Sequence, residues 1–257
     1  MRGELFDQGS LSDLCDGAAV VVHLSGIIEQ KPNRGQTFER VHHLGVKNLT
    51  IAARQAGVKR WIHMSALGAR PDAPAEYHRT KFKGEQHVRA SGLDWTIFRP
   101  SLIHGPGGEF MQMVAGFWRK MLPPFVPYFA DGVFGTQGGR DVQPVWVEDV
   151  ARAFVKAIEV DQSIGEIYPM GGADAMDWPT MYRTVKQHLK GAKPKPVVGF
   201  PAWKAKLIAG WPGVPFNIDQ VHMAMEDSVC STAKLKSHLD IDVAPFERTL
   251  RDYADQL

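Results

Sequence analysis

The chain has 257 residues, of which 44% are hydrophobic, and a formal net charge of +2. This length allows one large α/β unit, or a main domain with a smaller appended one, and the low net charge gives no general basis for nucleic-acid binding. Two isolated cysteines, Cys15 and Cys230, indicate neither a disulfide framework nor a metal knuckle. No apolar run approaches the roughly 18 residues that span a bilayer, so we expect a cytoplasmic protein that is at most peripheral to the inner face of a membrane.

The chain opens with a short helix and a buried strand. Ser10 and Asp13 predict a capping box at the start of the helix. The apolar run 18–24 is typical of a strand in a parallel sheet that is covered on both faces. It closes on Gly26, which either lets a ligand approach the backbone or only forms a turn.

A β-α-β unit follows from the pattern of the next forty residues. The apolar positions of 37–56 recur with a helical period, and the helix is stopped by Gly57. The run from Trp61 to Ser65 then predicts a strand. We therefore expect two parallel strands joined by a right-handed connection.

The most informative residues follow that strand. Ser65 would lie at its carboxyl end, where open α/β sheets bind ligands. Tyr77 and Lys81 are spaced i,i+4 and share one helical face, so the lysine could supply the cation that a phenol needs for proton transfer near neutral pH. The alternative is an ordinary surface pair. Tyr182 and Lys186 repeat the spacing without a preceding strand that ends in serine, and we predict a structural role for them.

The middle of the chain predicts pocket walls rather than further chemistry. A strand at 94–100 runs into the glycine-rich loop 101–108, which lacks a Lys-Ser or Lys-Thr ending and therefore favours a turn over a phosphate cradle. The Met- and Phe-rich helix 109–121 belongs to the core or lines a substrate pocket. Residues 122–141 are predicted to form a loop.

The last third alternates short strands and helices. Strands are predicted at 145–147 and 166–170, and the following helices are expected to be capped by Asp149 and Asp177. The tail 217–257 predicts two helices. The ten histidines form no His-Glu-x-x-His motif and no Cys/His cluster, so we expect no metal.

The stretch Trp178–Ile218 contains no acidic residue. Its basic residues are Arg183, Lys186, Lys190, Lys193, Lys195, Lys204 and Lys206, which leaves about −5 (2 − 7) for the remainder of the chain. Trp203, Leu207, Ile208 and Trp211 share one helical face, which is typical of a helix at a membrane surface or on an acidic protein partner. The alternative is a core-facing helix with a solvated basic side.

Several motifs in order resemble the short-chain dehydrogenase/reductase superfamily in its extended and atypical branches. They are Gly3-Glu4-Leu5-x-Asp7, Val22-His23-Leu24-Ser25-Gly26, Ser65, Tyr77-x-x-x-Lys81, Arg99-Pro100-Ser101 with Gly105-Pro106, and Val147-x-Asp149-Val150-Ala151. Segments 38–42, 77–81 and 92–100 are most similar to proteins related to the NAD(P)-binding alpha-subcomplex accessory subunit of respiratory complex I, NADH:ubiquinone oxidoreductase, and to NAD-dependent epimerase/dehydratase-like proteins.

The resemblance implies a Rossmann-type, doubly wound parallel α/β sheet, apparently lacking its first strands, with a small C-terminal α/β substrate lobe. Residues 1–108, with about 142–170, would form the NAD(P)-binding core. Residues 109–257 would mostly form the substrate or partner lobe. The chain would begin after the first strand and the Gly-x-x-Gly-x-x-Gly turn, so we expect a shortened form or a misplaced start.

The resemblance also implies roles for individual residues. Ser65, Tyr77 and Lys81 would be catalytic: Ser65 would hold a substrate oxygen, and Lys81 would lower the pKa of Tyr77. NAD or NADP would be bound by Glu4 and Leu5 at the adenine, by Leu24, Ser25 and Gly26 along the ribose and pyrophosphate, by Met64 and Lys81, and by Pro100 and Ile103 at the nicotinamide.

Two functions are compatible with these residues. One is an oxidoreductase or epimerase that acts on a small-molecule substrate. The other is a non-catalytic nucleotide-binding accessory, assembly or redox-sensing protein that docks on a protein or membrane surface through Trp178–Ile218. The second is favoured by His42, which stands where the superfamily has an asparagine that supports the catalytic lysine.

Overall fold

The computed structural model describes residues 4–136, 139–211, 213–214 and 216–257, so Gly3 of the first motif and Pro212 and Pro215 of the basic stretch lie outside the described residues. The chain divides into two compact units. The first contains the chain up to Pro100, Ala151–Met170 and Ala233–Ile241. The second contains Ser101–Val150, Gly171–Thr232 and Asp242–Leu257. The first unit therefore includes 233–241, a segment that the sequence analysis assigned to the C-terminal lobe.

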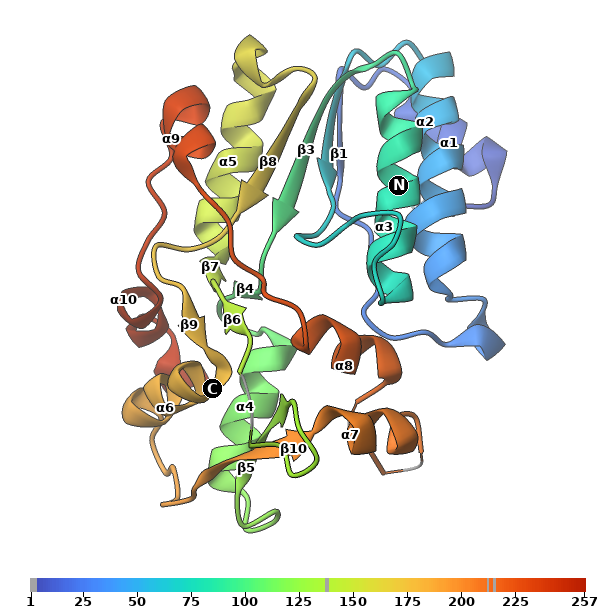
Figure 1. Cartoon of the computed structure of the whole chain (residues 1–257). Helices are drawn as coiled ribbons and strands as arrows, with labels where there is room; N and C mark the ends of the chain where they lie inside the picture. The colour runs from blue at the N-terminus through green and yellow to red at the C-terminus, as the bar shows by residue number, and fades with distance from the viewer. Residues whose placement is uncertain (1–3, 137–138, 212, 215) are drawn as a thin grey trace. The chain divides into compact units, whose positions relative to one another are not determined.

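A four-stranded sheet forms the centre of the first unit (Figure 1). Its order is β1-β2-β3-β8, and all neighbouring strands are parallel. The strands are β1 (Val20–His23), β2 (Arg60–Met64), β3 (Asp94–Pro100) and β8 (Glu166–Met170). The predicted strands are confirmed to within a few residues at their ends, and β8 lies at an edge of the sheet, where its Pro169 needs no ladder partner on the open side.

Helices cover both faces of this sheet, which confirms the doubly wound α/β architecture. On one face lie α1 (Gln8–Cys15), α2 (Gly45–Gln55) and α3 (Glu76–Arg89), where α1 and α2 pack with Trp61 and Ile97 of the sheet in a buried apolar cluster. On the other face, Phe154 of α5 (Val147–Glu159) stacks on Phe98 with ring centroids 4.6 Å apart. The short helices η1 (Pro32–Arg34), η3 (Asp161–Ser163) and α9 (Ala233–Leu239) complete the unit.

Two predicted helix caps are wrong. Helix α1 is capped by Asp7, whose carboxylate accepts hydrogen bonds from the backbone of Gly9 (3.0 Å) and Ser10 (3.3 Å), because the helix starts earlier than the Ser10 pattern suggested. Asp149 lies inside α5, within its first turn. Its carboxylate instead accepts the backbone N–H of Ala244 at 2.7 Å.

The predicted helix 37–56 consists of a π-helix followed by an α-helix. Its first part, η2 (Glu39–Leu44), is a π-helix, and α2 follows directly. Gly84 of α3 lies so close to η2 that a Cβ at this position would clash with the backbone oxygen of His42. Wide π-turns are frequent at functional sites. Here the wide turn carries His42 against α3.

We expect Gly84→Ala to destabilise the protein by about 3 kcal/mol, because the new methyl group meets rigid backbone rather than a movable side chain. Denaturant unfolding measures the change in the free energy of unfolding. Gly92→Ala is the control for general glycine effects at a turn, since a Cβ there meets no atom within 4 Å although its φ of +76° carries strain. Equal losses in the two variants would contradict the close packing of α3 on η2.

Among its described residues, the second unit contains three two-stranded sheets. Strand β4 (Ile103–His104) pairs in parallel with β7 (Val145–Trp146), and β5 (Val126–Ala130) pairs in parallel with β10 (Val197–Pro201). An antiparallel pair joins β6 (Asp141–Val142) to β9 (Met176–Asp177). The prediction of a loop over 122–141 is wrong at β5. Pro127 lies within this strand, and proline is typical of loops rather than of strands.

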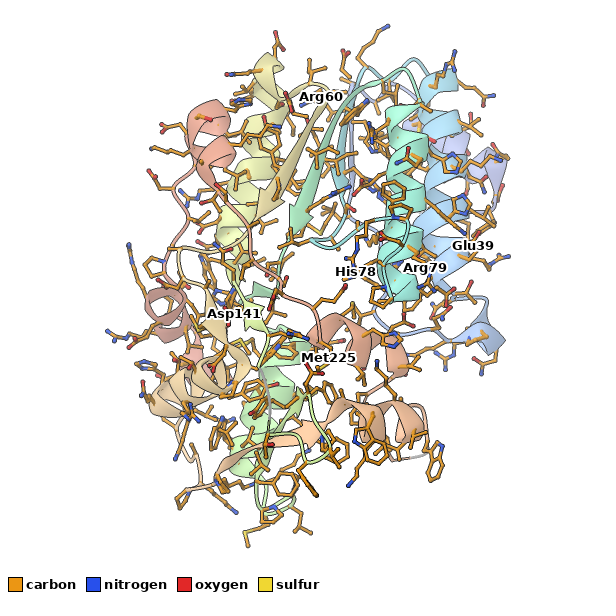
Figure 2. All side chains as sticks on the ribbon, viewed as in Figure 1. Glu39, Arg60, His78, Arg79, Asp141 and Met225 are labelled. Carbon is orange, nitrogen blue, oxygen red and sulfur yellow. The ribbon has the colours of Figure 1, made fainter. Side chains whose placement is uncertain are left out.

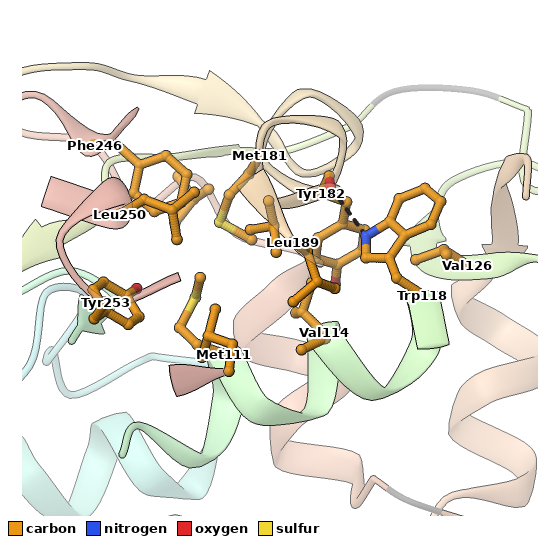
Figure 3. Close-up of a cluster of buried hydrophobic side chains, with 14 of the residues drawn as sticks. Met111, Val114, Trp118, Val126, Met181, Tyr182, Leu189, Phe246, Leu250 and Tyr253 are labelled. Carbon is orange, nitrogen blue, oxygen red and sulfur yellow. Dashed lines mark hydrogen bonds between the residues drawn. The ribbon is translucent and has the colours of Figure 1, made fainter. Parts of the chain in front are cut away.

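The core of the second unit lies between α4 (Glu109–Arg119), α6 (Trp178–His188) and α10 (Phe246–Arg251), as Figure 3 shows. Met111 and Trp118 of α4 are buried there, so part of the methionine-rich stripe is core. Tyr182 is also buried, and the indole N–H of Trp118 donates to its backbone oxygen at 3.1 Å. The unit also contains α7 (Ala202–Ile208), α8 (Ile218–Ala224) and η4 (Ala254–Gln256). With α8, α9, α10 and η4, the tail 217–257 has more helices than the two predicted.

Candidate functional site

The candidate site lies in the first unit, at the end of the sheet where the strands finish. Figure 2 shows His78 and Arg79, near the start of α3, at this end, and Arg60 at the opposite end. Arg60 has a structural role there, since its guanidinium donates to the backbone oxygen of Ala157 and the hydroxyl of Ser163. The chemistry-bearing side chains therefore come from β1, β2, η2 and α3.

Helix α3 presents Tyr77, Lys81 and Glu85 at i, i+4 and i+8, on one face. Lys81 is only 5% exposed, and its ammonium donates to the backbone oxygen of Met64 at 3.2 Å. The same nitrogen lies 5.9 Å from the centre of the Tyr77 ring. Lys81 thus connects the tyrosine to the carboxyl end of β2, directly before Ser65.

Burial controls the protonation of this pair. It lowers the pKa of Lys81 to about 8, with Glu85 acting in the opposite direction, and it raises the pKa of Tyr77 to about 12. The resemblance implied that Lys81 would lower the pKa of Tyr77. The structure shows the opposite direction, because desolvation of the phenolate dominates. Tyr77 consequently retains its proton at neutral pH and can act as a hydrogen-bond and proton donor.

Ser65 is buried at the end of β2, with its backbone N–H donating to Phe98 at 2.8 Å. Its hydroxyl oxygen has no hydrogen-bond partner among the described residues. Buried hydroxyls in folded proteins are normally paired. The hydroxyl of Ser65 is therefore suited to receive a polar atom of a bound molecule.

The loop after β1 brings its backbone against Lys81. Leu24, Ser25 and Gly26 are exposed, although they follow a strand whose last residue, His23, is buried. A Cβ on Gly26 would lie 3.0 Å from the Lys81 ammonium and 3.6 Å from Nε2 of His42. A side chain at this position would crowd the Lys81 ammonium and would be in ordinary contact with His42, so glycine lets the loop lie directly on the ammonium.

His42 joins this loop to the helix that carries Tyr77. Its Nε2 accepts the backbone N–H of Ile27 at 3.0 Å, and its Nδ1 lies 3.2 Å from the hydroxyl of Thr80. Burial, followed by the charge of Lys81, lowers the pKa of His42 to about 2, so the ring is neutral. Since Nε2 accepts, the proton must be on Nδ1, which donates to Thr80. His42 also meets Tyr77 edge-on at 5.2 Å.

A stacked histidine pair is the feature that sequence reasoning missed. His23 and His63 lie opposite each other on β1 and β2, with ring centroids 5.0 Å apart. Burial and Lys81 lower the pKa of His23 to about 3. Neither ring has a hydrogen-bond partner among the described residues. The sequence does show one histidine within each of these two apolar strands, and this pattern could have indicated the pair.

The other predicted cofactor-binding residues are divided between the two units. In the first unit, the backbone N–H of Glu4 donates to Ser10 and the backbone oxygen of Leu5 accepts from the Asn48 amide. Pro100 ends β3 in the same unit. Ile103 begins β4 in the second unit, so the structure groups with the first unit every predicted residue except Ile103.

A surface hollow of about 370 Å³ lies beside this site, against residues that include Glu39, Pro71, Arg79 and Lys83. Ser65 and Lys81 do not line it, so we assign it no role. Among the residues that the structure describes, no group of three or more His, Cys, Asp or Glu side chains could hold a metal ion. No helix in the described part of the chain is long and apolar enough to cross a membrane.

Comparison with known proteins shows which proteins this chain is similar to. Residues 1–114 match a family model described as NAD(P)H-binding. The chain is 28% identical over 258 residues to NADH dehydrogenase [ubiquinone] 1 alpha subcomplex subunit 9 of Arabidopsis thaliana, and it covers 61% of that protein. It is 31% identical over 196 residues to ceramide reductase of Caulobacter vibrioides, of which the match covers 57%. The chain thus spans about three fifths of the length of these relatives.

Solved structures show the same fold. UDP-glucose 4-epimerase from Thermotoga maritima, with UDP-glucose, superposes with a TM-score of 0.73 at 19% identity and covers 100% of this chain, while the chain covers 83% of the epimerase. The Thermus thermophilus UDP-glucose 4-epimerase in complex with NAD gives a TM-score of 0.72 at 23% identity, with 99% of this chain and 83% of the other covered. At these identities the likeness establishes the fold alone.

Proposed function

From the relationship of this chain to NAD(P)H-binding proteins of the short-chain dehydrogenase/reductase type, which include complex I alpha subcomplex subunit 9, we propose that it binds NAD or NADP and carries out oxidoreductase or epimerase-type chemistry. The observation that supports this most strongly is the position of Lys81. Its ammonium is buried, is bonded to the residue before Ser65, and lies against Gly26 on the same helical face as Tyr77.

The residues around Lys81 fit a dinucleotide in two respects. A side chain on residue 26 would crowd the Lys81 ammonium. Because Gly26 has none, a bound molecule can contact the backbone of Gly26 and the ammonium of Lys81 at the same place. The hydroxyl of Ser65 is buried and without a partner among the described residues. In this proposal, Gly26 and Lys81 bind the dinucleotide, which supplies or accepts a hydride when it is bound.

Tyr77 would move the proton in this reaction. Its high pKa keeps the phenol protonated at neutral pH, so it can donate to a substrate oxygen that gains negative charge as the carbonyl is reduced. Ser65 would hold that oxygen in place. The charge of Lys81 would stabilise the tyrosinate that remains, since an opposite charge nearby favours the ionised form.

The relative named ceramide reductase makes carbonyl reduction on a lipid the first reaction to assay. A second relative, sterol demethylase protein B of Methylococcus capsulatus, is also named after a lipid and is 30% identical over 167 residues. We propose a lipid ketone as the substrate class. The test is consumption of NADH or NADPH that depends on the ketone.

A non-catalytic accessory role is the second candidate. It is supported by the complex I subunit relatives and by His42, which takes the place of the superfamily's asparagine and bonds to Ile27 instead of supporting the lysine. In that case the protein would bind the dinucleotide and dock on a protein or membrane through the basic stretch. Binding of NADPH without turnover on any tested ketone or nucleotide sugar would favour this role.

A further inference from the structure

Several large apolar side chains of the second unit are exposed on a small set of segments. They come from the end of α4 onward, from the loop after β5, and from α7 and the residues that follow it. We call them the apolar patch: Met121, Leu122, Val133, Phe134, Trp203, Leu207 and Trp211. Single exposed apolar residues are normal in proteins, whereas a contiguous group marks an interaction surface.

These segments are joined by direct contacts. The indole N–H of Trp203 donates to the backbone oxygen of Val133 at 3.4 Å. The ammonium of Lys195 donates to the backbone oxygen of Pro123 at 2.8 Å. Strand β10 begins two residues after Lys195, is followed directly by α7, and pairs with β5. Figure 1 shows β5, β10 and α7 adjacent in the second unit. Val133 and Phe134 therefore lie with α7 at the end of the β5–β10 pair where both strands finish, and Met121 and Leu122 lie at the end where both strands begin.

Helix α7 presents its large side chains to solvent. Trp203 is 49% exposed, Leu207 is 67% exposed and Trp211, three residues beyond the helix, is 64% exposed. The buried side of the helix consists of Ala202 and Ala205, which pack in a small cluster with Val221 of α8. The alternative of a core-facing helix is therefore wrong for Trp203, Leu207 and Trp211, because the alanines occupy the inner face, while Ile208 is half-buried.

Positive charge accompanies the apolar patch. Lys120, Lys204 and Lys206 are exposed, and in the part of the chain that the structure describes no acidic side chain pairs with any of them. The ammonium of Lys204 lies 5.3 Å from the ring centre of Trp203. The nearby Asp131 is itself paired with Arg140 at 2.9 Å. The surface thus combines exposed aromatic and aliphatic tips with uncompensated lysines.

We infer that the apolar patch docks on the surface of an anionic lipid bilayer. Tryptophan and leucine side chains enter the boundary between headgroups and acyl chains, while lysines attract the anionic headgroups. A specific protein interface would be expected to deplete lysine relative to the rest of the surface, whereas here lysines lie among the apolar residues. This inference does not depend on dinucleotide binding, and it would bring the protein to a lipid substrate.

Vesicle co-sedimentation of the whole chain tests the inference. We expect binding to vesicles of phosphatidylcholine with phosphatidylglycerol to exceed binding to phosphatidylcholine alone by at least about tenfold, and to fall as salt is raised. The variants Leu207→Ser with Trp211→Ser, and Lys204→Gln with Lys206→Gln, should each lose most of that binding. The matched control is Val155→Ser with Lys156→Gln on α5, where an exposed valine adjoins an exposed lysine in the first unit.

Equal sedimentation with both kinds of vesicle, or full binding by the Leu207/Trp211 variant, would overturn the inference. A dimer in light scattering that the same variant converts to a monomer, without vesicle binding, would also overturn it and assign the apolar patch to a second copy of the chain. Calorimetric titration of the variants with NADPH separates this result from the proposed function, since Gly26 and Lys81 lie in the first unit.

Discussion

Replacing Tyr77 with phenylalanine is expected to lower turnover by roughly 10²–10⁴-fold, the usual contribution of a positioned proton donor. The substitution removes only the hydroxyl. The ring keeps its edge contacts with Phe38 at 5.8 Å and His42 at 5.2 Å, so the affinity for the dinucleotide and the stability should change little. Single-turnover reduction of a lipid ketone by NADPH measures the effect on the chemical step.

Tyr182→Phe is the matched control for this experiment. Tyr182 has a lysine at i+4, as Tyr77 does, but it lies in the buried cluster of the second unit. We expect it to leave turnover unchanged within about twofold, because its hydroxyl has no part in the proposed chemistry. Wild-type turnover in Tyr77→Phe would refute the assignment of Tyr77, whereas equal losses in both variants would indicate a loss of folded protein.

The second large effect is expected at the buried ion pair beneath Lys81. The Glu85 carboxylate is fully buried, and Arg99 of β3 binds both of its oxygens, at 2.8 Å and 2.6 Å. Arg99→Met should destabilise the protein by about 3–5 kcal/mol, because it leaves a buried carboxylate without its partner. Urea unfolding at neutral pH measures this loss.

Two further variants distinguish burial from charge. In the double variant Arg99→Met/Glu85→Met both partners become apolar, so the protein should recover much of the stability lost in the single variant. Lys83 lies on the same helix as Glu85, and Lys83→Met breaks an exposed pair with Glu39 of η2, so it should change stability by less than about 1 kcal/mol. A small loss in Arg99→Met, comparable to that in Lys83→Met, would contradict the account of this pair.

The inner strands of the central sheet were predictable, because an apolar run such as 94–100 is typical of a strand buried on both faces. The run 18–24 also forms a parallel strand, but β1 lies at an edge of the sheet and its Val22 is 42% exposed, so the prediction that this strand is covered on both faces is wrong. Residues 122–141 and 196–201 were harder to predict, since prolines and glycines interrupt the β-patterns of β5 and β10. The orientation of α7 depends on whether small or large residues face inward, which periodicity alone cannot decide.

The placement of Tyr77 and Lys81 was predictable, whereas the stacked His23 and His63 and the electrostatics of the candidate site were not. The spacing of Tyr77 and Lys81 placed them on one face of a helix, as the structure shows. The direction of the Tyr77 pKa depends on burial, and burial depends on packing of Phe38 and His42 around the ring. The bond from His42 to Ile27 joins residues that only the wide turn of η2 brings together.

Calorimetric titration with NADH and NADPH is the most direct test of the proposed dinucleotide site. We expect the wild-type protein to bind at least one of the two, and Lys81→Met and Gly26→Val each to weaken that binding by about tenfold or more, since each removes or obstructs a contact at the loop after β1. Lys83→Met, an exposed lysine of the same helix, should bind as the wild type does. Absence of binding by the wild type, or unchanged affinity in both site variants, would contradict the account.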